Sequence, residues 1–480
     1  MNRLRMVFEK YKKTSVPVKA SLWYTICNIL QKGISFIVIP IYTRVLSTTE
    51  YGEYSVFQSW LNILIIFATL NLYCGVFTKA MVEYDDDRDR YTSCMQALST
   101  MLTVGLFLIY LIRIEFWNSL FRMETMTMIL MFLYFVFYPA IMFWSVRQRV
   151  EYKYKSMVIV TLLVSVAIPI ISLLLLFYTD LRSKAVIWGY LLVQGVAGSI
   201  FYGYNFIKGK IFYEKKYWIH ALKFNIPLIP HYLSLIVLGQ ADRIMIGKYC
   251  GTGKTAIYNL AYQVSMLMNI FIVAINNSLV PWTYARLKEK EYKSIKKTSN
   301  SLCIMNAVMT IGAILIAPEI IRILGTEEYI DAIWVIPMVT ISVYFTFVYS
   351  LFSNVEFYFG QTKYVMVASV VGAILNIILN AMFIPKYGFI AAGYTTLFCY
   401  FTFMVMHFLF MRKVCSKQIG EELVYDIKFI IVSCLLICAI GVLCMVLYNF
   451  TVIRYVVIVL GIVLYVVIRK KLVEIIKSFR

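Results

Sequence analysis

The chain has 480 residues, of which 61% are hydrophobic and 15% are charged, and its mean hydropathy is +0.76. Soluble domains carry about 25% charged residues, so these charges are too few to cover a soluble fold, and a soluble protein is excluded. Glycine (22) and proline (10) are scarce and 16% of residues are aromatic, which excludes fibrous and disordered chains.

Fourteen segments, taken in chain order, are apolar for long enough to cross about 30 Å of hydrocarbon as helices. They lie near residues 21–43, 54–76, 94–114, 124–146, 156–178, 185–207, 220–247, 256–280, 298–318, 331–355, 364–385, 388–411, 427–448 and 452–468. No loop between them is long enough for a soluble domain. The predicted fold is therefore an all-α polytopic membrane protein with about 14 transmembrane helices.

The net charge of +21 follows the predicted topology. With the N-terminus inside, 33 Lys/Arg fall in cytoplasmic segments and 11 in external loops. Cytoplasmic loops are enriched in Lys and Arg, so the bias predicts that both termini lie inside. The excess charge then points to anionic lipid headgroups as partners and not to nucleic acid.

The two halves of the sequence resemble each other at an offset near 200 residues. The first span ends at Arg44 and the seventh near Arg243, 199 positions later, and Gly189-Tyr190 recurs as Gly393-Tyr394 at an offset of 204. Such repeats are typical of transporters that work by alternating access. We therefore expect two pseudo-symmetric six-helix lobes and a C-terminal helix pair. The predicted parts are a basic cytoplasmic N-terminus (1–19), an N-lobe (20–208), a C-lobe (209–413), and a helix pair with a basic tail (414–480).

Polar side chains recur at helical spacing in several predicted spans, which indicates a face turned away from lipid. Asn and Ser can also join helices by hydrogen bonds, and for single residues this alternative is the simpler one. The aligned stripes favour a hydrated central cavity. The amide residues predicted to line it are Asn28, Gln31, Gln58, Asn62, Asn225, Gln240, Asn259, Gln263, Asn376 and Asn380.

Ionisable residues within spans are the sharpest candidates for function. Lys32 lies halfway along its span, where a charge costs about 2.5–3.5 kcal/mol, so we expect it to face water, an acid or an anionic ligand. Arg44 and Lys248 lie near span ends, where snorkelling to headgroups is the alternative. Asp242 and Arg243 are adjacent and cannot face each other on a helix, so each needs another partner.

No pattern in the sequence predicts catalysis, a cofactor or a metal. Gly251–Thr255 is similar to the end of a phosphate-binding loop, but the required first glycine falls at Lys248 and the segment follows a helix instead of a strand. The ten cysteines show no zinc or redox spacing, and a disulfide framework is not implied. We expect a protein that is not an enzyme.

Three motifs resemble the polysaccharide flippases, the O-antigen and exopolysaccharide translocases of the multidrug/oligosaccharidyl-lipid/polysaccharide (MOP) exporter superfamily. They are Thr43-Arg44-Val45-Leu46 through Tyr51-Gly52-Glu53-Tyr54, Pro227-Leu228-Ile229-Pro230-His231 through Asp242-Arg243, and Leu375-Asn376-Ile377-Ile378-Leu379-Asn380 through Pro385-Lys386-Tyr387-Gly388. The resemblance implies transfer of undecaprenyl-diphosphate-linked oligosaccharide repeat units from the inner to the outer leaflet of the bacterial cytoplasmic membrane. It also implies association with a polysaccharide polymerase and assembly proteins.

The resemblance gives the candidate residues their roles. The diphosphate would pair with four cations, and the amide stripes would bind sugar hydroxyls. The four cations are Lys32, Arg44, Arg243 and Lys248. Asp242 and His231 are the candidates for ion coupling, by H⁺ or Na⁺, although a histidine at this place is more often a core residue.

Other functions remain open at this point. A cation-coupled multidrug exporter and a lipid II flippase of the same superfamily are the nearest alternatives. A membrane polysaccharide polymerase fits less well, because it would need a large external loop with catalytic residues, and the loops of this chain are short.

Overall fold

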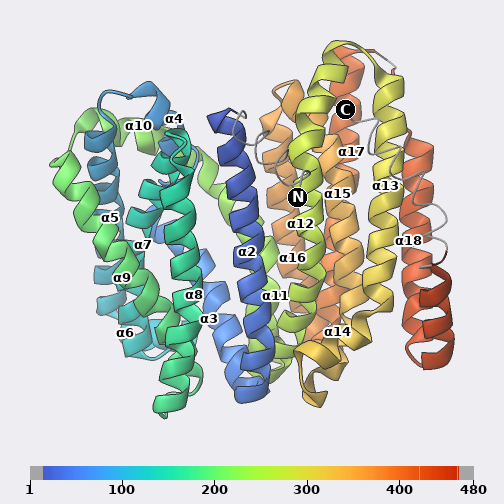
Figure 1. The fold of residues 1–480 in the computed structure, drawn as a ribbon, viewed down its shortest axis with the longest axis horizontal. Coiled ribbons are helices and arrows are strands. Elements are labelled where there is room, and N and C mark those ends of the chain that lie inside the picture. The colour runs from blue at the N-terminus through green and yellow to red at the C-terminus, as the bar shows by residue number, and fades with distance from the viewer. Residues whose placement is uncertain (1–14, 421, 462, 464–480) are drawn as a thin grey trace, which may run out of the picture. The chain divides into compact units, whose positions relative to one another are not determined.

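The computed structural model describes residues 15–420, 422–461 and 463 (Figure 1). Within these residues the regular elements are helices, and no strand occurs. The first half contains α2 (Val16–Val45), α3 (Thr48–Thr69), α4 (Val76–Glu83), α5 (Arg88–Ile112), α6 (Ile114–Phe121), α7 (Thr125–Val150), α8 (Tyr154–Tyr178), α9 (Ser183–Gly209), α10 (Lys215–Asn225), the 3₁₀ turn η1 (Ile226–Leu228) and α11 (Ile229–Tyr249). The second half contains α12 (Thr252–Lys288), α13 (Tyr292–Leu315), α14 (Ala317–Leu324), the 3₁₀ segment η2 (Glu327–Trp334), α15 (Ile336–Tyr358), α16 (Thr362–Tyr387), α17 (Ile390–Gln418) and α18 (Ile427–Leu447).

The predicted all-α polytopic class is confirmed. Twelve helices of the described chain are long and apolar enough to cross a membrane, with α10, η1 and α11 counted together. The two remaining predicted spans correspond to α3 and to a short apolar helix, Thr451–Gly461. The α3 helix is less apolar, because Glu50, Gln58 and Asn62 lie in it, and part of the last predicted span, 452–468, lies outside the described residues.

Proline explains the break in the seventh predicted span. The α10 helix ends at Asn225, a 3₁₀ turn follows, and α11 begins at Ile229. Pro227 lies in the turn and Pro230 is the second residue of α11. Proline has no backbone N–H and its ring crowds the preceding turn, so an unbroken helix through this segment is disfavoured.

The chain forms two compact units, an N-terminal unit that ends at Ile236 and a C-terminal unit that begins at Val237. This division falls within α11. It comes later than the boundary that the internal repeat predicts between residues 208 and 209, because α10 packs on α4 and α5 through Tyr217 and Ala221. The lobes of six helices each remain a proposal.

The N-terminal unit is built around α9, which packs against α5, α7 and α8. Glycines allow two of these close crossings, because small residues let helix backbones approach. A Cβ atom at Gly198 would lie 2.5 Å from the carbonyl oxygen of Phe137 on α7, and one at Gly189 would lie 2.7 Å from Cα of Ser172 on α8. Neither distance is compatible with a side chain.

A capping box fixes the start of α3. The Ser47 hydroxyl accepts a hydrogen bond from the Glu50 backbone N–H at 3.3 Å, and the Ser47 N–H donates to the Glu50 carboxylate at 2.8 Å. The same carboxylate accepts two hydrogen bonds from Arg182, at 2.7 and 3.0 Å, beside the start of α9. Two free N–H groups of a helix start are thereby satisfied. The contact also joins the starts of α3 and α9.

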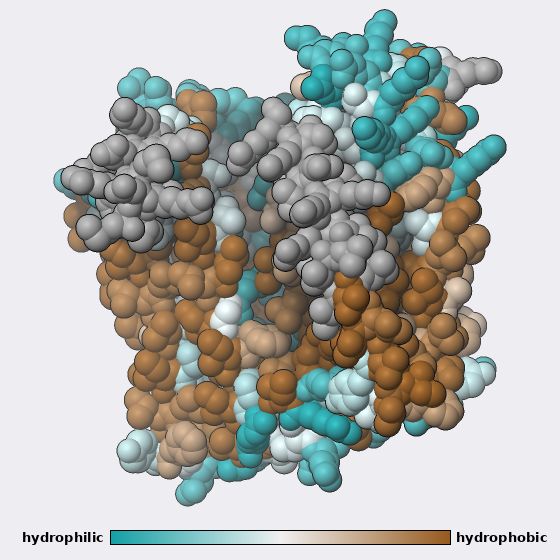
Figure 2. All heavy atoms as spheres, turned by 45° about the vertical axis from the view of Figure 1, so that its right-hand side comes forward, coloured by the Kyte–Doolittle hydropathy of each residue, from teal (hydrophilic) through white to brown (hydrophobic). Residues whose placement is uncertain are grey.

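The C-terminal unit is built around α15, whose apolar stretch is 83% buried. Helices α12, α13, α16, α17 and α18 pack against it. A helix that is apolar on all sides is expected to be enclosed by others. On the face drawn in Figure 2, apolar side chains cover the middle of the helices and hydrophilic side chains gather at their two ends, as expected for helices in lipid.

Candidate functional site

A buried carboxylate, Asp242 on α11, lies at the centre of a polar site in the C-terminal unit. One oxygen, Oδ2, accepts hydrogen bonds from the hydroxyls of Tyr258 at 2.6 Å and Thr396 at 2.8 Å. The other, Oδ1, accepts from the amide nitrogens of Asn376 at 3.1 Å and Asn380 at 2.5 Å. The Asp242 side chain is fully buried, and these four donors replace the water that a buried charge would otherwise need. We call these five residues the Asp242 centre.

Helical spacing explains how α16 and α17 reach this centre. Asn376 and Asn380 are four residues apart and therefore lie on one face of α16, where the Asn380 amide also donates to Asn376 at 3.1 Å. The hydroxyl of Thr395 on α17 donates to the Asn380 side-chain oxygen. The sequence predicts the stripe on α16, and the structure adds that it is directed at Asp242.

Arg243, the neighbour of Asp242, is 6% exposed and is engaged within the same unit. Its guanidinium donates to Asn259 at 2.7 Å, to the Gly239 carbonyl at 2.6 Å and to Gln240 at 3.3 Å, and it lies 4.2 Å from the centre of the Tyr262 ring. Arg243 therefore holds two of the predicted sugar-binding amides in place. In this conformation its guanidinium donates within the protein and is not open for a bidentate contact with a diphosphate.

Three predicted amides of the N-terminal unit make local or interhelical contacts. Gln31 on α2 donates to the Ser165 hydroxyl on α8 at 3.0 Å, which is the helix-joining role weighed above. On α3, Gln58 donates to the Tyr54 hydroxyl at 3.2 Å and Asn62 donates to the Gln58 carbonyl at 2.8 Å. Gln58 and Asn62 are half-buried.

The other predicted amides differ in their surroundings. Asn225 is buried and donates to the Leu70 carbonyl at 2.7 Å, while its side-chain oxygen is buried and accepts no hydrogen bond within the described chain. Asn225 therefore ties α10 to the end of α3. Asn28 is exposed on α2, and Gln263 is half-buried on α12.

Three of the four predicted cations are exposed. Lys32 lies near the middle of α2 and has no hydrogen-bond or ion-pair partner among the residues that the structure describes. Arg44 donates to the Pro40 carbonyl one turn earlier at 2.9 Å. The Lys248 ammonium lies 5.5 Å from the centre of the Tyr249 ring. Lys32 is thus the predicted cation that is most open to an anion.

His231 belongs to the N-terminal unit, whereas Asp242 belongs to the C-terminal unit. The His231 side chain is half-buried, and its Nδ1 atom is buried without a hydrogen-bond partner in the described structure. The nearest aromatic contact recorded is with the Tyr232 ring, 6.0 Å between ring centres. It therefore makes fewer polar contacts than Asp242.

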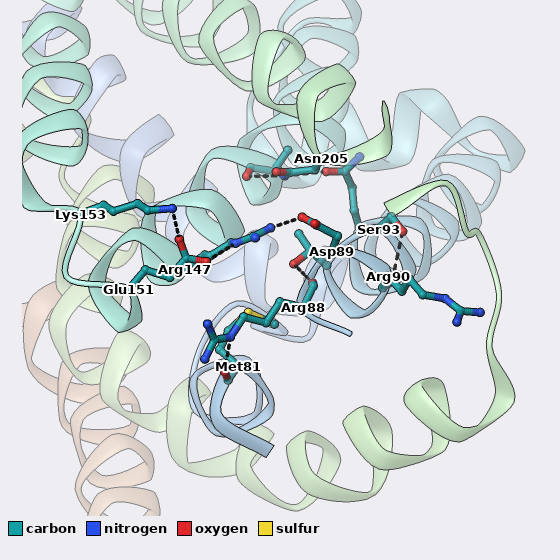
Figure 3. A network of polar contacts seen from close by, with 12 residues as sticks. Met81, Arg88, Asp89, Arg90, Ser93, Arg147, Glu151, Lys153 and Asn205 are labelled. Carbon is teal, nitrogen blue, oxygen red and sulfur yellow. Dashed lines mark hydrogen bonds and ion pairs between the residues drawn. The ribbon is translucent and has the colours of Figure 1, made fainter. Parts of the chain in front are cut away.

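Ion pairs tie together the ends of α5 and α7 in the N-terminal unit (Figure 3). Arg147 on α7 pairs with Asp89 on α5 and donates to Glu151 at 2.7 Å, and Lys153 lies 2.6 Å from the other Glu151 oxygen. Burial opposes ionisation of Glu151, but the hydrogen bonds from Lys153 and Arg147 outweigh it and lower the pKa of this carboxyl. These ion pairs hold the helix ends together.

The sequence reasoning missed some polar residues of the C-terminal unit. Tyr258 and Thr396 complete the Asp242 centre, Thr395 supports Asn380 from α17, and Glu356 pairs with His407 inside the unit. An ionisable residue inside an apolar span is a functional candidate by itself, so Glu356 and His407 could have been identified from the sequence. Tyrosine and threonine are common in spans and could not have been.

Within the described residues no group of three or more His, Cys, Asp or Glu is arranged to hold a metal ion. The ten cysteines are free.

The twelve candidate spans of the described chain and the buried polar sites between its helices define the class of polytopic membrane proteins. The chain belongs to the polysaccharide biosynthesis protein family, whose model matches residues 18–286. The MatE family model matches residues 227–382. The resemblance to the MOP superfamily is therefore confirmed, and the protein falls among its transporters and flippases.

The chain is also similar to individual proteins, in sequence to some and in fold to others. An uncharacterised membrane protein of Methanocaldococcus jannaschii is 21% identical over 443 residues, which cover 85% of this chain and 86% of that one. The inward closed conformation of the lipid II flippase MurJ matches with a TM-score of 0.71 at 14% identity, over 94% of this chain and 99% of that one. An inward-facing MATE multidrug transporter of the MOP superfamily has a TM-score of 0.62 at 14% identity, over 83% and 98%. These structures share the fold.

Proposed function

We propose that this protein is a flippase for lipid-linked oligosaccharides. It moves undecaprenyl-diphosphate-linked repeat units from the inner to the outer leaflet of a bacterial cytoplasmic membrane by alternating access, for the synthesis of a surface polysaccharide. Both termini lie in the cytoplasm, as the Lys/Arg distribution indicates. A polysaccharide polymerase and assembly proteins use the delivered units.

Membership in the polysaccharide biosynthesis family supports the substrate class, and Lys32 is the structural observation that carries the proposal. An ammonium near the middle of a spanning helix costs about 2.5–3.5 kcal/mol when it has no compensation. Lys32 is exposed and has no partner within the described residues. An anionic headgroup that passes α2 would supply the missing counter-charge, and a diphosphate has the required chemistry.

The remaining candidate residues bind the two parts of the substrate head, the diphosphate and the sugar. Lys248 and Arg44 lie near helix ends and attract the diphosphate by charge. The half-buried side chains of Gln58 and Asn62 bind sugar hydroxyls. The membrane potential, negative inside, favours outward movement of an anion by about 2.3 kcal/mol per charge per 100 mV. Arg243 positions Asn259 and Gln240, and it reaches the substrate only if these contacts open.

We also propose that the Asp242 centre is the ion-coupling site. Its carboxylate is enclosed by two amides and two hydroxyls, whose oxygens can ligate a monovalent cation once the amide groups turn. A proton on the carboxylate would neutralise the same buried charge. His231 is the weaker candidate, because its buried Nδ1 atom has no hydrogen-bond partner among the described residues.

A lipid II flippase is the second candidate. The MurJ structure covers 94% of this chain, compared with 83% for the MATE transporter. Lipid II carries the same kind of polyprenyl diphosphate, and the predicted role of Lys32 is the same for both substrates. A multidrug exporter is less favoured, because the exposed ionisable residue in the middle of α2 is a cation.

Deletion of the gene followed by lipid analysis tests the proposal. We expect single lipid-linked repeat units to accumulate on the inner leaflet, while cell-wall synthesis and growth continue. Accumulation of lipid II with growth arrest would favour the second candidate. Single units that are accessible from outside would point to a polymerase and would contradict flipping.

A further inference from the structure

Glu356 on α15 and His407 on α17 form an ionisable pair that has no role in the proposed transport cycle. Both side chains have no exposed surface, and Nδ1 of His407 lies 3.0 and 3.1 Å from the two oxygens of Glu356. The Tyr349 ring stacks on the imidazole with 5.3 Å between ring centres and 19° between the planes, and the Phe403 ring meets it edge-on at 4.7 Å. The pair is therefore sealed by aromatic rings.

One atom of the pair lacks a partner. Nε2 of His407 is buried and makes no hydrogen bond within the described structure. If the imidazole is neutral and donates its Nδ1–H to Glu356, this nitrogen keeps an unused lone pair and the pair carries one negative charge. Proton uptake from water, on Nε2 or on the carboxylate, makes the pair neutral overall, and release reverses the step.

Among the residues that the structure describes, His407 is the ion-pair partner of Glu356. Helices α12, α13, α16 and α18 also pack on α15. Among the described residues none of their titratable side chains has a recorded contact with either member of the pair, and the phenol that touches it is Tyr349 of α15 itself. A buried net charge without a counter-ion is costly, so proton uptake by the pair, which removes this charge, is favoured by burial.

Tyrosines lie beside both this pair and the Asp242 centre. Tyr258 donates to Asp242 at 2.6 Å, and its ring lies 6.2 Å from that of Tyr262. At the other site the Tyr349 ring stacks on His407. The two sites therefore lie in one buried region of the C-terminal unit, where charges are weakly screened.

Position along α17 gives the separation of the two sites. Thr396 of the Asp242 centre and His407 lie eleven residues apart on this helix. The rise of an α-helix makes that distance about 16 Å. The two sites are thus far enough apart to bind separately, yet close enough for their charges to interact in a buried region.

We infer that the Glu356–His407 pair is a proton-binding site of the C-terminal unit, linked by charge to the Asp242 centre of the same unit. The pair binds a single proton, and its affinity for that proton depends on the charge at Asp242. Proton occupancy and cation occupancy at the two sites then oppose each other, because each adds positive charge to the same buried region.

Nitrogen-15 NMR of the histidine rings tests this inference on the full-length protein in lipid nanodiscs. The chain has three histidines, and the His407 signals are assigned by their loss in His407→Gln. We expect these ring nitrogens to show one pH transition in the wild type. Constant His407 signals at every pH at which the protein stays folded would overturn the inference and indicate a permanent structural pair.

Variants test the partner and the link. Glu356→Gln keeps a hydrogen-bond acceptor but removes the negative charge, and should move the His407 transition by about tenfold or more toward higher proton concentration. Asp242→Asn should move it in the same direction by a smaller factor. The matched control is Glu319→Gln, whose carboxylate binds Arg454 in the same unit and which should leave the transition in place.

An unchanged transition in Glu356→Gln would overturn the site, and an unchanged transition in Asp242→Asn would overturn the link. Size-exclusion elution shows whether each variant is folded, and the wild-type titration needs no variant. No substrate is present in these measurements, so failure here is distinct from failure of the proposed flipping.

Discussion

Replacing Asp242 by asparagine tests the Asp242 centre most sharply. Asparagine keeps the size of the side chain but offers one acceptor oxygen instead of two, so either the two hydroxyls or the two amides must face its NH₂ group. A buried donor without an acceptor costs about 1–3 kcal/mol. The hydroxyls of Tyr258 and Thr396 lie 3.3 Å apart and can bond to each other. The net loss is then nearer that of one donor, about 1–3 kcal/mol.

Thermal unfolding of the purified protein, followed by intrinsic fluorescence, measures this loss. The matched control is Asp331→Asn, which removes an exposed carboxylate 3.3 Å from Lys254 and should cost about 0.2–1 kcal/mol. We expect a clearly lower unfolding midpoint for Asp242→Asn than for Asp331→Asn. We also expect Asp242→Asn to abolish any dependence of transport on Na⁺ or pH. Equal midpoints for the two variants would refute the argument that four donors depend on Asp242.

Three further predictions concern the N-terminal unit. Lys32→Ala should abolish translocation at normal membrane levels of the protein, whereas Lys32→Arg should retain it; full activity of Lys32→Ala would remove this residue from the mechanism. Gly198→Ala should destabilise the protein by about 1–3 kcal/mol through its contact with α7, whereas Gly195→Ala on the same helix, with open space around it, should stabilise it by about 0.5–1 kcal/mol. Glu151→Gln should lower the thermal midpoint at neutral pH but not in acid. The lowered pKa of Glu151 stabilises the fold above its ordinary value of 4.5, and this stability is lost as the pH falls through the pKa of the folded state. An equal effect at both pH values would contradict this.

The helices could be predicted from the sequence because hydrocarbon imposes a length and a polarity on every span. All fourteen predicted segments contain a helix, and the break before α11 follows from Pro227 and Pro230. The place where the packing divides could not be predicted. It depends on the side on which α10 packs, and Tyr217 and Ala221 reveal this only through their partners.

The candidate site was predictable in part. Helical spacing brings Asn376 and Asn380 to one face, and the adjacency of Asp242 and Arg243 means that each needs its own partner. Which partner each takes depends on how four helices rotate against one another. Apolar helix surfaces allow many such rotations, so the donors on α12 and α17 emerge only from the fold.

Transbilayer movement of the lipid-linked substrate is the most direct test of the central claim. Purified protein is reconstituted into liposomes that contain the lipid-linked units extracted from the deletion strain, and access of a soluble glycosidase to the units is followed over time. The account predicts that wild-type protein makes the inner-leaflet pool accessible and that Lys32→Ala protein does not. Equal accessibility with wild-type protein and with protein-free liposomes would contradict it.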